Sequence, residues 1–483
     1  MAQHQHGTLG SLDWAPPTLA CHSDFEARPG YDSCKAHEYL DTPEVLAAKV
    51  KVLAVLVKAS SSCVAYTGAG ISTAAGIADY ASEAAREAGT SVTVGAAQAM
   101  LRSPMESAPT AAHCVLTAMH SAGYLKRWVQ QNHDGLPQKA GYPQHALNEI
   151  HVSTSGRKKE EEAGGGTGHI LIDCLWLQGA WFDPANPVVK MEGELRSDLF
   201  ADLLQWEQQT DLCLAMGTSL AGMNADRIAS TVADTAASGG LTSGGAPALG
   251  TVIVSLQQTA LDAKASLRIF AKIDDVMTAL ADELAIAPAT PPSFLGDLSH
   301  DAGLEEDVFR VPYSSDGERM PANFVEASTW PILDLREGKR VRIVSGVYAG
   351  DEGEVVGRSR HGHYQVRFLH TLTNRNGRAW KAPMTHTLGG WFATEAAAGL
   401  LERIPIESIP EDAGETEEQV MSDFHAGDVA CSVQAEPPVV GAGSLPDWVK
   451  ASFVEGKQAQ GEGEEEGPMT PQQIPAPVDS PAA

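Results

Sequence analysis

Apolar and polar positions along residues 42 to 287 follow two alternating patterns, which predict helices and strands in turn. Thr42-Pro43-Glu44 predicts a helix start with Thr42 as the N-cap, and the helix is expected to run from Val45 to Ser60. Predominantly apolar runs, typical of buried strands, follow at Cys63–Thr67, Leu125–Val129, Ile170–Leu177, Leu212–Met216 and Thr251–Leu256. Strands separated by helical stretches predict an α/β fold, a doubly wound parallel sheet with helices on both faces.

The pattern changes after residue 287. Residues 288–332 are a connector that contains proline, serine and aspartate. Within 333–405, three short segments alternate apolar and polar residues between glycine-containing turns: Val341–Val344, Gly353–Val356 and His363–Phe368. Close-spaced strands with glycine turns predict a small C-terminal β-barrel.

Length and charge refine this organisation. A chain of 483 residues predicts about three domains, and its formal net charge of -28 argues against indiscriminate binding to nucleic acid or anionic membranes. Residues 406–483 hold 16 acidic and 2 basic residues and are rich in proline and glycine, which predicts a disordered acidic tail. The apolar island Leu445–Phe453 fits a partner-binding helix, but a chance cluster is the favoured interpretation.

Composition also argues against membrane and secreted classes. No run of about 18 apolar residues is present, and the polar, His-rich start of the sequence lacks an apolar signal core. Seven scattered cysteines form no Cys-x-x-Cys pair, which is typical of a reducing compartment. We therefore expect an intracellular protein, nuclear or cytoplasmic, with no membrane partner.

The first segment that can carry chemistry is Thr67–Ser72. A strand that ends in glycines before a helix lets backbone N–H groups approach a pyrophosphate, and the helix N-terminus favours the negative charge. The third glycine of the usual dinucleotide fingerprint is displaced to Gly76. A tight structural turn would need similar glycines, so this loop alone leaves both interpretations equally open.

Two further polar segments follow along the chain. Asn132 and Asp134 come just after the strand Leu125–Val129, where side chains face the ligand crevice of a parallel sheet. An Asx-type turn closed by Gly135 explains the same residues structurally. His151 is the default general base if it faces that crevice, although a lone histidine is more often a satisfied polar residue.

Two more strand-to-loop junctions complete the series. Gly217–Leu220 follows Leu212–Met216, and Ser255–Gln257 follows Thr251–Val254. Hydroxyl and amide groups there suit phosphate or ribose, while each junction alone also fits an ordinary turn between a strand and a helix. Five such junctions in order favour a ligand crevice more strongly than any one of them.

Taken together, these segments resemble the sirtuins, which are NAD-dependent protein deacylases, over about residues 36 to 287. The resemblance is carried by Thr67–Thr73 with Gly76, Ile77 and Asp79, by Pro109-Thr110 with His113, by Gln131-Asn132 with Asp134-Gly135, by Gly217–Leu220 and by Asp275–Met277. Ser60–Ser62 and Ala140–Pro143 are most similar to the class IV branch, which includes chromatin-associated members.

The resemblance implies a Rossmann-like fold, NAD as cofactor, and acylated protein lysines as substrates. His151 would be the general base, Asn132 and Asp134 would hold nicotinamide and its ribose, and nicotinamide and O-acyl-ADP-ribose would be released. The implied cofactor contacts are Gly68, Ala69, Gly70, Ser72, Asp79, Tyr80, Gln131, Asn132, Asp134, Gly217, Thr218, Ser219, Ser255, Leu256, Gln257 and Ile273.

The sequence departs from the family pattern near the expected site. Ala78 and Ala81 replace the usual proline and arginine, Val152 replaces a glycine, and Ser255 replaces an asparagine. Loss of the arginine removes a fixed cation beside the cofactor, and one missing positioning contact can cost orders of magnitude in rate. A catalytically weakened NAD-binding scaffold or sensor and a mono-ADP-ribosyltransferase therefore stay open as alternatives.

The family's zinc module is not recognisable. A structural zinc needs four ligands, usually from two Cys-x-x-Cys pairs, whereas residues 152–188 hold one cysteine, Cys174, and one histidine, His169. A charged, glycine-rich stretch, Arg157–Gly166, stands in that region. We predict no structural zinc and a reduced small lobe.

Gly338–Val355 resembles a KOW motif in an SH3-like barrel. Residues 334–403 hold 11 basic and 7 acidic residues, with the aromatic residues Tyr348, Tyr364, Trp380 and Trp391 near arginines. Such surfaces suit RNA or methylated-tail recognition. A protein–protein module whose aromatics fill a small core is the favoured interpretation. The expected organisation is an N-terminal extension (1–35), a catalytic domain (36–287), a linker (288–332), a barrel (333–405) and the acidic tail (406–483).

Overall fold

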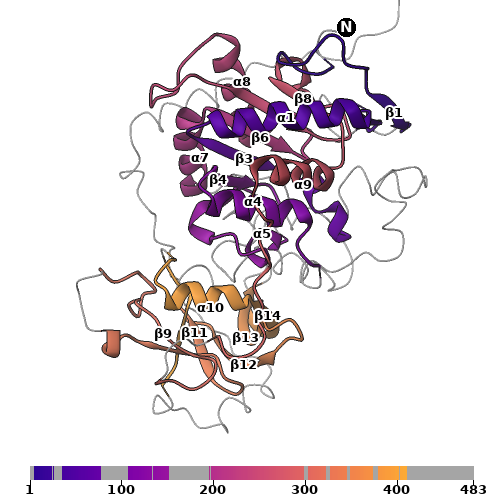
Figure 1. The fold of residues 1–483 in the computed structure, drawn as a ribbon. Helices are drawn as coiled ribbons and strands as arrows, with labels where there is room; N and C mark the ends of the chain where they lie inside the picture. The colour runs from indigo at the N-terminus through magenta and orange to yellow at the C-terminus, as the bar shows by residue number, and fades with distance from the viewer. Residues whose placement is uncertain are drawn as a thin grey trace, which may run out of the picture. The chain divides into compact units, whose positions relative to one another are not determined.

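A computed structural model describes the two folded parts of the chain (Figure 1). The described residues are 5–23, 26, 35–77, 107–132, 134–151, 195, 197–298, 303–321, 327–344, 349–373, 379–401 and 403–410. The expected strand Ile170–Leu177 and the tail beyond residue 410 lie outside these ranges.

A six-stranded parallel sheet forms the centre of the first part, as the apolar runs predict. Its strand order is β5-β4-β3-β6-β7-β8. The strands are β3 (Cys63–Thr67), β4 (Leu125–Gln130), β5 (Leu147–Glu149), β6 (Leu212–Met216), β7 (Gly250–Val254) and β8 (Leu267–Ile269). Every residue of β3, β6 and β7 is buried, which is typical of a parallel sheet covered on both faces.

Helices cover the two faces of this sheet (Figure 1). The helices α1 (Pro43–Ala59), α4 (Ala111–Ser121) and α9 (Ile273–Leu284) share one hydrophobic core with Cys63 and Ala65 of β3. The helices α7 (Ser197–Gln209) and α8 (Arg227–Ala237) share a second core with Val64 and Tyr66. Successive side chains of a strand point to opposite faces, so β3 contributes to both cores.

Helix α1 begins as the sequence predicts. Thr42 is the N-cap, its hydroxyl accepts a hydrogen bond from the Val45 N–H at 3.4 Å, and Pro43 occupies the first helical position. Ser60 is the C-cap. Strand β7 is shorter than the apolar run indicates, because the chain leaves the sheet after Val254 and Leu256 lies in the following loop.

The start of the chain packs on the edge strand of the sheet. The Thr8 N–H donates to the Ala265 carbonyl at 2.9 Å, and the Arg268 N–H donates to the His6 carbonyl at 3.0 Å. Strand β1 (Thr18–Cys21) then pairs antiparallel with β2 (Glu38–Leu40). Part of the expected N-terminal extension thus covers the β8 edge.

The second part contains the antiparallel strands that the glycine spacing predicts. One sheet has the order β14-β13-β12-β11-β15. Its strands are β11 (Arg340–Ile343), β12 (Glu352–Arg358), β13 (Tyr364–Thr373), β14 (Ala379–Leu388) and β15 (Ile406–Ser408). The strands β9 (Val308–Arg310) and β10 (Ile332–Asp334) pair separately, and α10 (Gly390–Ala397) packs into the same hydrophobic core. Closure of this sheet into a barrel stays a prediction.

One boundary prediction is wrong. Residues 406–408 do not begin the disordered tail, because they form β15 and pair with β11. Ile406 is 1% exposed and lies opposite Ile343, so burial of its side chain offsets the cost of ordering this short segment. Among the helices of the described residues, none has the length and hydropathy needed to span a bilayer.

Candidate functional site

The predicted polar loops start side by side at one edge of the parallel sheet. In the ladder, Thr67 at the end of β3 lies opposite both Gln130 of β4 and Met216 of β6, and Met216 lies opposite Val254 of β7. The loops that follow these strands therefore leave the sheet at the same level. Junctions far apart in the sequence therefore leave the sheet at one common edge, the kind of edge where parallel sheets bind ligands.

The loop after β3 and the loop after β6 contact each other through the backbone atoms of glycines. The Gly70 N–H donates to the Gly217 carbonyl at 2.9 Å. A Cβ atom at Gly68 would lie 2.7 Å from the Gly217 oxygen, and one at Gly70 would lie 2.7 Å from the Gly217 Cα atom. Gly217 itself has a φ of +61°. These three glycines are thus required by the contact between the loops.

The loop after β4 is hydrogen-bonded to the loops after β3 and β6. The Asn132 amide donates from Nδ2 to the Gly68 carbonyl at 3.0 Å and to the Ser72 Oγ at 3.2 Å. The Gln131 amide donates from Nε2 to the Thr218 Oγ1 at 2.9 Å. The loop after β4 thus bonds the loop after β3 through Asn132 and the loop after β6 through Gln131.

Asp134 closes a local turn and also bonds a residue of another loop. Its Oδ1 atom accepts from the Leu136 N–H at 3.1 Å, which is the expected Asx-type turn, and Gly135 has a φ of +65°. Its Oδ2 atom accepts from the Ser72 hydroxyl at 2.5 Å. Asp134 is 7% exposed and Ser72 is 1% exposed, so this hydrogen bond between two junctions is shielded from water.

His113 brings a neutral imidazole to the same region. It is fully buried, and burial lowers its pKa to about 4, against the opposing effect of the Asp134 charge. Its Nδ1 atom lies 2.8 Å from the Thr110 hydroxyl. Within the part of the chain that the structure describes, its buried Nε2 atom has no hydrogen-bond partner. Among the described residues, this buried nitrogen therefore has unused hydrogen-bonding capacity.

His151 lies just beyond β5 and is 4% exposed. The Ile150 N–H donates to the Gln130 carbonyl at 3.1 Å, which holds His151 at the same sheet edge, beside the end of β4. Two residues earlier, burial raises the pKa of Glu149 to about 7, although amides of Gln138, Gln144 and Gln130 oppose the shift. Sequence reasoning missed Glu149, whose position beside the histidine in Glu-Ile-His was the available signal.

Lys139 was also missed. It lies in the short helix α5 (Leu136–Lys139), is 7% exposed, and its ammonium donates to the Ser107 carbonyl at 3.1 Å. Burial lowers its pKa to about 8, while the charge of Asp134 opposes that shift. A lysine within a Gly-Leu-Pro-Gln-Lys stretch has no distinctive pattern, so its burial is visible only in the fold.

Several predicted site residues lie outside the described residues. They are Ala78, Asp79, Tyr80, Ala81, Val152 and the stretch in which zinc ligands would be expected. Among the described residues, no group of three or more His, Cys, Asp or Glu side chains is arranged to hold a metal ion. The absence of a structural zinc therefore stays a prediction.

The fifth junction and Ile273 are described. Ser255, Leu256 and Gln257 are half-buried in the loop after β7, and Ile273 begins α9. The Gln257 N–H donates to the Ser255 Oγ at 3.2 Å. Because Met216 lies opposite Val254 in the ladder, Ser255 and Gly217 both directly follow paired strand residues.

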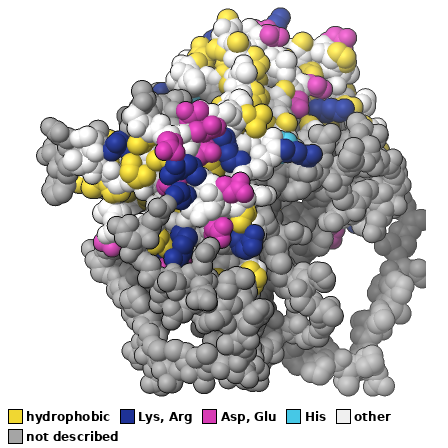
Figure 2. All heavy atoms as spheres, turned by 90° about the horizontal axis from the view of Figure 1, so that it is seen from below, with side chains coloured by type: hydrophobic (Ala, Val, Ile, Leu, Met, Phe, Trp, Pro, Cys, Tyr) yellow, Lys and Arg dark blue, Asp and Glu magenta, His cyan; other side chains and the backbone are white. Residues whose placement is uncertain are grey.

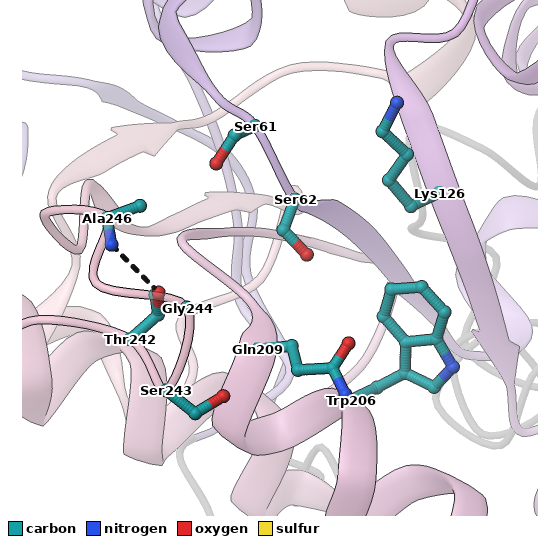
Figure 3. A pocket seen from close by; sticks show the side chains of 9 residues that line it. All are labelled: Ser61, Ser62, Lys126, Trp206, Gln209, Thr242, Ser243, Gly244 and Ala246. Atoms are coloured by element: carbon teal, nitrogen blue, oxygen red, sulfur yellow. Dashed lines mark hydrogen bonds between the residues drawn. The ribbon is translucent and has the colours of Figure 1, made fainter.

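A separate cavity of about 470 Å³ lies at the opposite edge of the sheet (Figure 3). Ser61 and Ser62 precede β3, Lys126 is at the start of β4, and Gln209 ends the helix before β6. The labelled side chains include the indole of Trp206 on the Lys126 side of the cavity (Figure 3). The amino-terminal ends of the strands surround it, so it is distinct from the candidate site.

The donor set of the candidate site suits a dinucleotide. At Gly68 and Gly70 the space of a side chain is filled by Gly217, and both N–H groups donate to carbonyls of the neighbouring β6 strand end, so these glycines serve the contact between the loops. Asn132 and Asp134 add an amide and a carboxylate, which match an amide-bearing base and ribose hydroxyls. The described site thus places an amide and a carboxylate together at one sheet edge.

Curated proteins similar to this chain are sirtuins. "NAD-dependent protein deacetylase sirtuin-7" of Bos taurus is 29% identical over 278 residues, which cover 52% of this chain and 64% of that protein. "NAD-dependent protein deacetylase Sirt6" of Drosophila melanogaster is 38% identical over 116 residues, covering 24% and 36%. "NAD-dependent protein deacetylase SRT1" of Oryza sativa subsp. indica is 31% identical over 257 residues, covering 50% and 49%.

The chain spans less than two thirds of the length of each of these relatives. Among solved structures, "Structure of Sir2Tm bound to a propionylated peptide" is 22% identical, covers 50% of this chain and 100% of that chain, and has a TM-score of 0.35. "Sir2-p53 peptide-NAD+" is 21% identical, covers 48% and 98%, and has a TM-score of 0.34. No family model matches the chain. The curated similarities support the sirtuin family for about half of the chain.

Proposed function

We propose that residues 36–287 form an NAD-binding sirtuin domain and that the protein is an NAD-dependent protein lysine deacylase. The observation that carries this proposal is the network that joins Asn132, Ser72 and Asp134 to the glycine backbone at Gly68. It links polar groups of two junctions at the edge where a dinucleotide would bind. The named activity of the curated relatives supports the same conclusion.

The residues divide between the two ends of the cofactor. Gly68, Ala69, Gly70 and Ser72 would hold phosphates, and Asn132 with Asp134 would hold nicotinamide and its ribose. Gly217, Thr218, Ser219 and the segment Ser255–Gln257 would hold phosphates and the adenosine end. Asp79, Tyr80, Gln131 and Ile273 complete the proposed contacts. When bound, NAD would supply a ribose from which nicotinamide leaves and which receives the acyl group of a lysine.

His151 would act as the general base at that ribose. An imidazole nitrogen accepts a proton at neutral pH, and burial at the sheet edge keeps competing water away from it. The Asp134 carboxylate, held by Ser72 and the Leu136 N–H, cannot rotate freely and so presents a fixed negative charge. These groups give the chain a base and an orienting carboxylate at one edge.

A second candidate is a catalytically weakened NAD-binding scaffold or sensor. The observation that favours it is in the sequence, where Ala81 and Val152 replace an arginine and a glycine of the family pattern. Both residues lie outside the described ranges. The similarity of Ser60–Ser62 and Ala140–Pro143 to the class IV branch favours a chromatin protein in either case, with a nuclear location.

Mass spectrometry of the full chain with NAD and acyl-lysine peptides tests these functions. We expect equal amounts of nicotinamide and O-acyl-ADP-ribose, and no product from His151→Ala. NAD binding without turnover would contradict the deacylase and support the scaffold. ADP-ribose attached to protein would support mono-ADP-ribosyl transfer instead.

For the C-terminal part, we propose an SH3-like, KOW-type barrel that binds protein. Tyr364 and Trp391 are buried in its core, at 0% and 6% exposed, so they offer no stacking surface for RNA bases. Tyr348 and the Trp380 side chain lie outside the described parts. The two aromatic residues that are described thus favour the core-filling interpretation.

The basic residues of this part are largely neutralised by neighbours. Arg340 and Arg342 both pair with Glu352, Arg358 pairs with Asp307, and Arg403 pairs with Glu318. Figure 2 shows Lys and Arg side chains intermixed with Asp and Glu on the described surface. Paired arginines release few counterions from a phosphate backbone, so we expect no salt-sensitive RNA binding by the full chain in fluorescence anisotropy.

A further inference from the structure

The guanidinium of Arg268 is buried beneath the loop after β7. Arg268 lies in the edge strand β8 and is 0% exposed. It donates from Nη1 to the Ser255 carbonyl at 2.9 Å and from Nη2 to the Gln257 carbonyl, and also from Nη1 to the Ile269 carbonyl at 2.8 Å. One side chain therefore ties two carbonyls of the loop to the edge of the sheet.

The same guanidinium holds the far end of the loop. Its Nε atom donates to the Asp262 Oδ1 at 2.7 Å, and that oxygen also accepts from the Thr259 hydroxyl at 2.6 Å. The Phe270 ring lies against the guanidinium, 3.6 Å from ring centroid to Cζ. The planar fork of donors is thus fixed by stacking and by an ion pair before it reaches the loop.

A third carbonyl of the loop is held from the other side. The Tyr39 N–H donates to the Leu256 carbonyl at 2.8 Å. The carbonyls of three consecutive residues, 255 to 257, are therefore all bonded to the protein, while their side chains remain half-buried at the sheet edge. Such a loop has little freedom to rotate its backbone, and it is the loop proposed to meet the adenosine end of NAD.

We propose that Arg268 is a positioning residue for the adenosine end of the dinucleotide, acting through the loop Ser255–Gln257. This inference rests on the proposed function. A cation needed only to balance Asp262 would not require two carbonyls of this loop, whereas a residue that shapes the loop would. Lysine keeps the charge but not the fork, since its single ammonium cannot reach all of these partners in the same geometry.

Isothermal titration calorimetry of the full chain with ADP-ribose tests this inference without depending on turnover. We expect Arg268→Lys to raise the Kd for ADP-ribose about tenfold or more. Asp262→Asn should raise the Kd for ADP-ribose by a smaller factor, because Arg268 keeps its contacts with the carbonyls of Ser255 and Gln257. In steady-state assays, Arg268→Lys should raise KM for NAD while KM for the acyl-peptide and kcat at saturating NAD change less than about twofold.

Lys49→Arg is the matched control. Lys49 is also a fully buried cation, paired with Asp41 at 2.7 Å, and its Nζ lies 5.9 Å from the same Phe270 ring. Its hydrogen bonds go to Asp41 and not to the loop. We expect this cation exchange to lower the melting temperature but to leave the Kd for ADP-ribose within about twofold.

The outcomes distinguish a wrong positioning role for Arg268 from a wrong proposed function. If wild-type protein binds ADP-ribose and Arg268→Lys binds it equally well, the positioning role is wrong and the proposed function stands. If Arg268→Lys and Lys49→Arg weaken binding equally, or if KM for the peptide rises as much as KM for NAD, Arg268 serves general stability only. If wild-type protein binds no ADP-ribose, the proposed function itself fails.

Discussion

The Ser72 hydroxyl donates to the Asp134 carboxylate at 2.5 Å, and this single hydrogen bond joins the loop after β3 to the loop after β4. The two residues are 62 positions apart in the sequence. Both are almost fully buried, so water does not compete for the interaction. The pair therefore couples the proposed phosphate-binding loop to the proposed nicotinamide-ribose residues.

Asp134→Asn tests this coupling. An amide keeps the size of the side chain but can accept at only one of the two positions that now bond Ser72 and the Leu136 N–H. We expect a loss of about 1–3 kcal/mol in the free energy of unfolding and a Kd for NAD raised about tenfold or more, measured by denaturant titration and calorimetry.

The control for that variant is Asp234→Asn. Asp234 pairs with Lys264 at the surface, where the two side chains are 55% and 52% exposed, so both measured quantities should stay near wild type. An unchanged Kd for Asp134→Asn would contradict the proposed role of the carboxylate.

A glycine pair tests the backbone contact between the loops. Gly217 and Gly222 both have positive φ angles, +61° and +93°, so alanine at either position carries the cost of a left-handed conformation, about 1–2 kcal/mol. At Gly217 the new Cβ would also lie 2.6 Å from the Ile71 nitrogen, whereas nothing lies within 4 Å at Gly222. We expect Gly217→Ala to be clearly more destabilising in thermal unfolding and to abolish NAD binding. Equal melting temperatures for the two variants would show that a Cβ at Gly217 does not clash with the Ile71 backbone.

His113 predicts a pH dependence of stability. Burial lowers its pKa to about 4 in the folded protein, below its ordinary value of 6.5. Between those values the unfolded chain binds the proton more tightly, so the stabilising contribution is complete above about pH 6.5 and is lost as the pH falls toward 4. Its size is about 3 kcal/mol.

The variant His113→Phe isolates that contribution. We expect the wild-type advantage over this variant in free energy of unfolding to shrink as the pH is lowered from 7 to about 4.5 in urea titrations. Other buried groups act equally in both proteins, including Glu149, whose raised pKa has the opposite sign. Parallel pH profiles would show that His113 is not held neutral by burial.

Metal analysis tests the predicted loss of the zinc module. Residues 152–188 hold only Cys174 and His169 as ordinary zinc ligands, which is too few for a structural site. We expect purified protein to contain far less than one zinc per chain and its melting temperature to be insensitive to a chelator. A content near one zinc per chain would mean that ligands come from elsewhere in the chain.

The sequence predicts much of the α/β core because most of its strands are short, predominantly apolar runs that end in polar or glycine-rich loops. Cys63–Thr67 and Leu212–Met216 match β3 and β6 residue for residue. The predicted convergence at Gly68, Asn132 and Gly217 followed from one rule, that parallel strands end at a common edge. Local pattern therefore sufficed wherever a single strand end fixed the position of a residue.

What the sequence could not predict depends on contacts between distant segments. Arg268 is one charged residue in an apolar strand, and only the fold shows that its guanidinium meets the carbonyls of Ser255 and Gln257. Ile406 looked like the start of an acidic tail because its neighbours are polar, yet pairing with β11 orders it. Such effects arise from tertiary partners, which local composition does not record.

Calorimetric titration of the full chain with NAD tests the central claim most directly. If the loops after β3, β4 and β6 jointly hold a dinucleotide, one molecule of NAD binds per chain and Asn132→Ala reduces the affinity strongly. The absence of binding heat with folded wild-type protein over a range of temperatures, or an affinity that Asn132→Ala leaves unchanged, would contradict the claim.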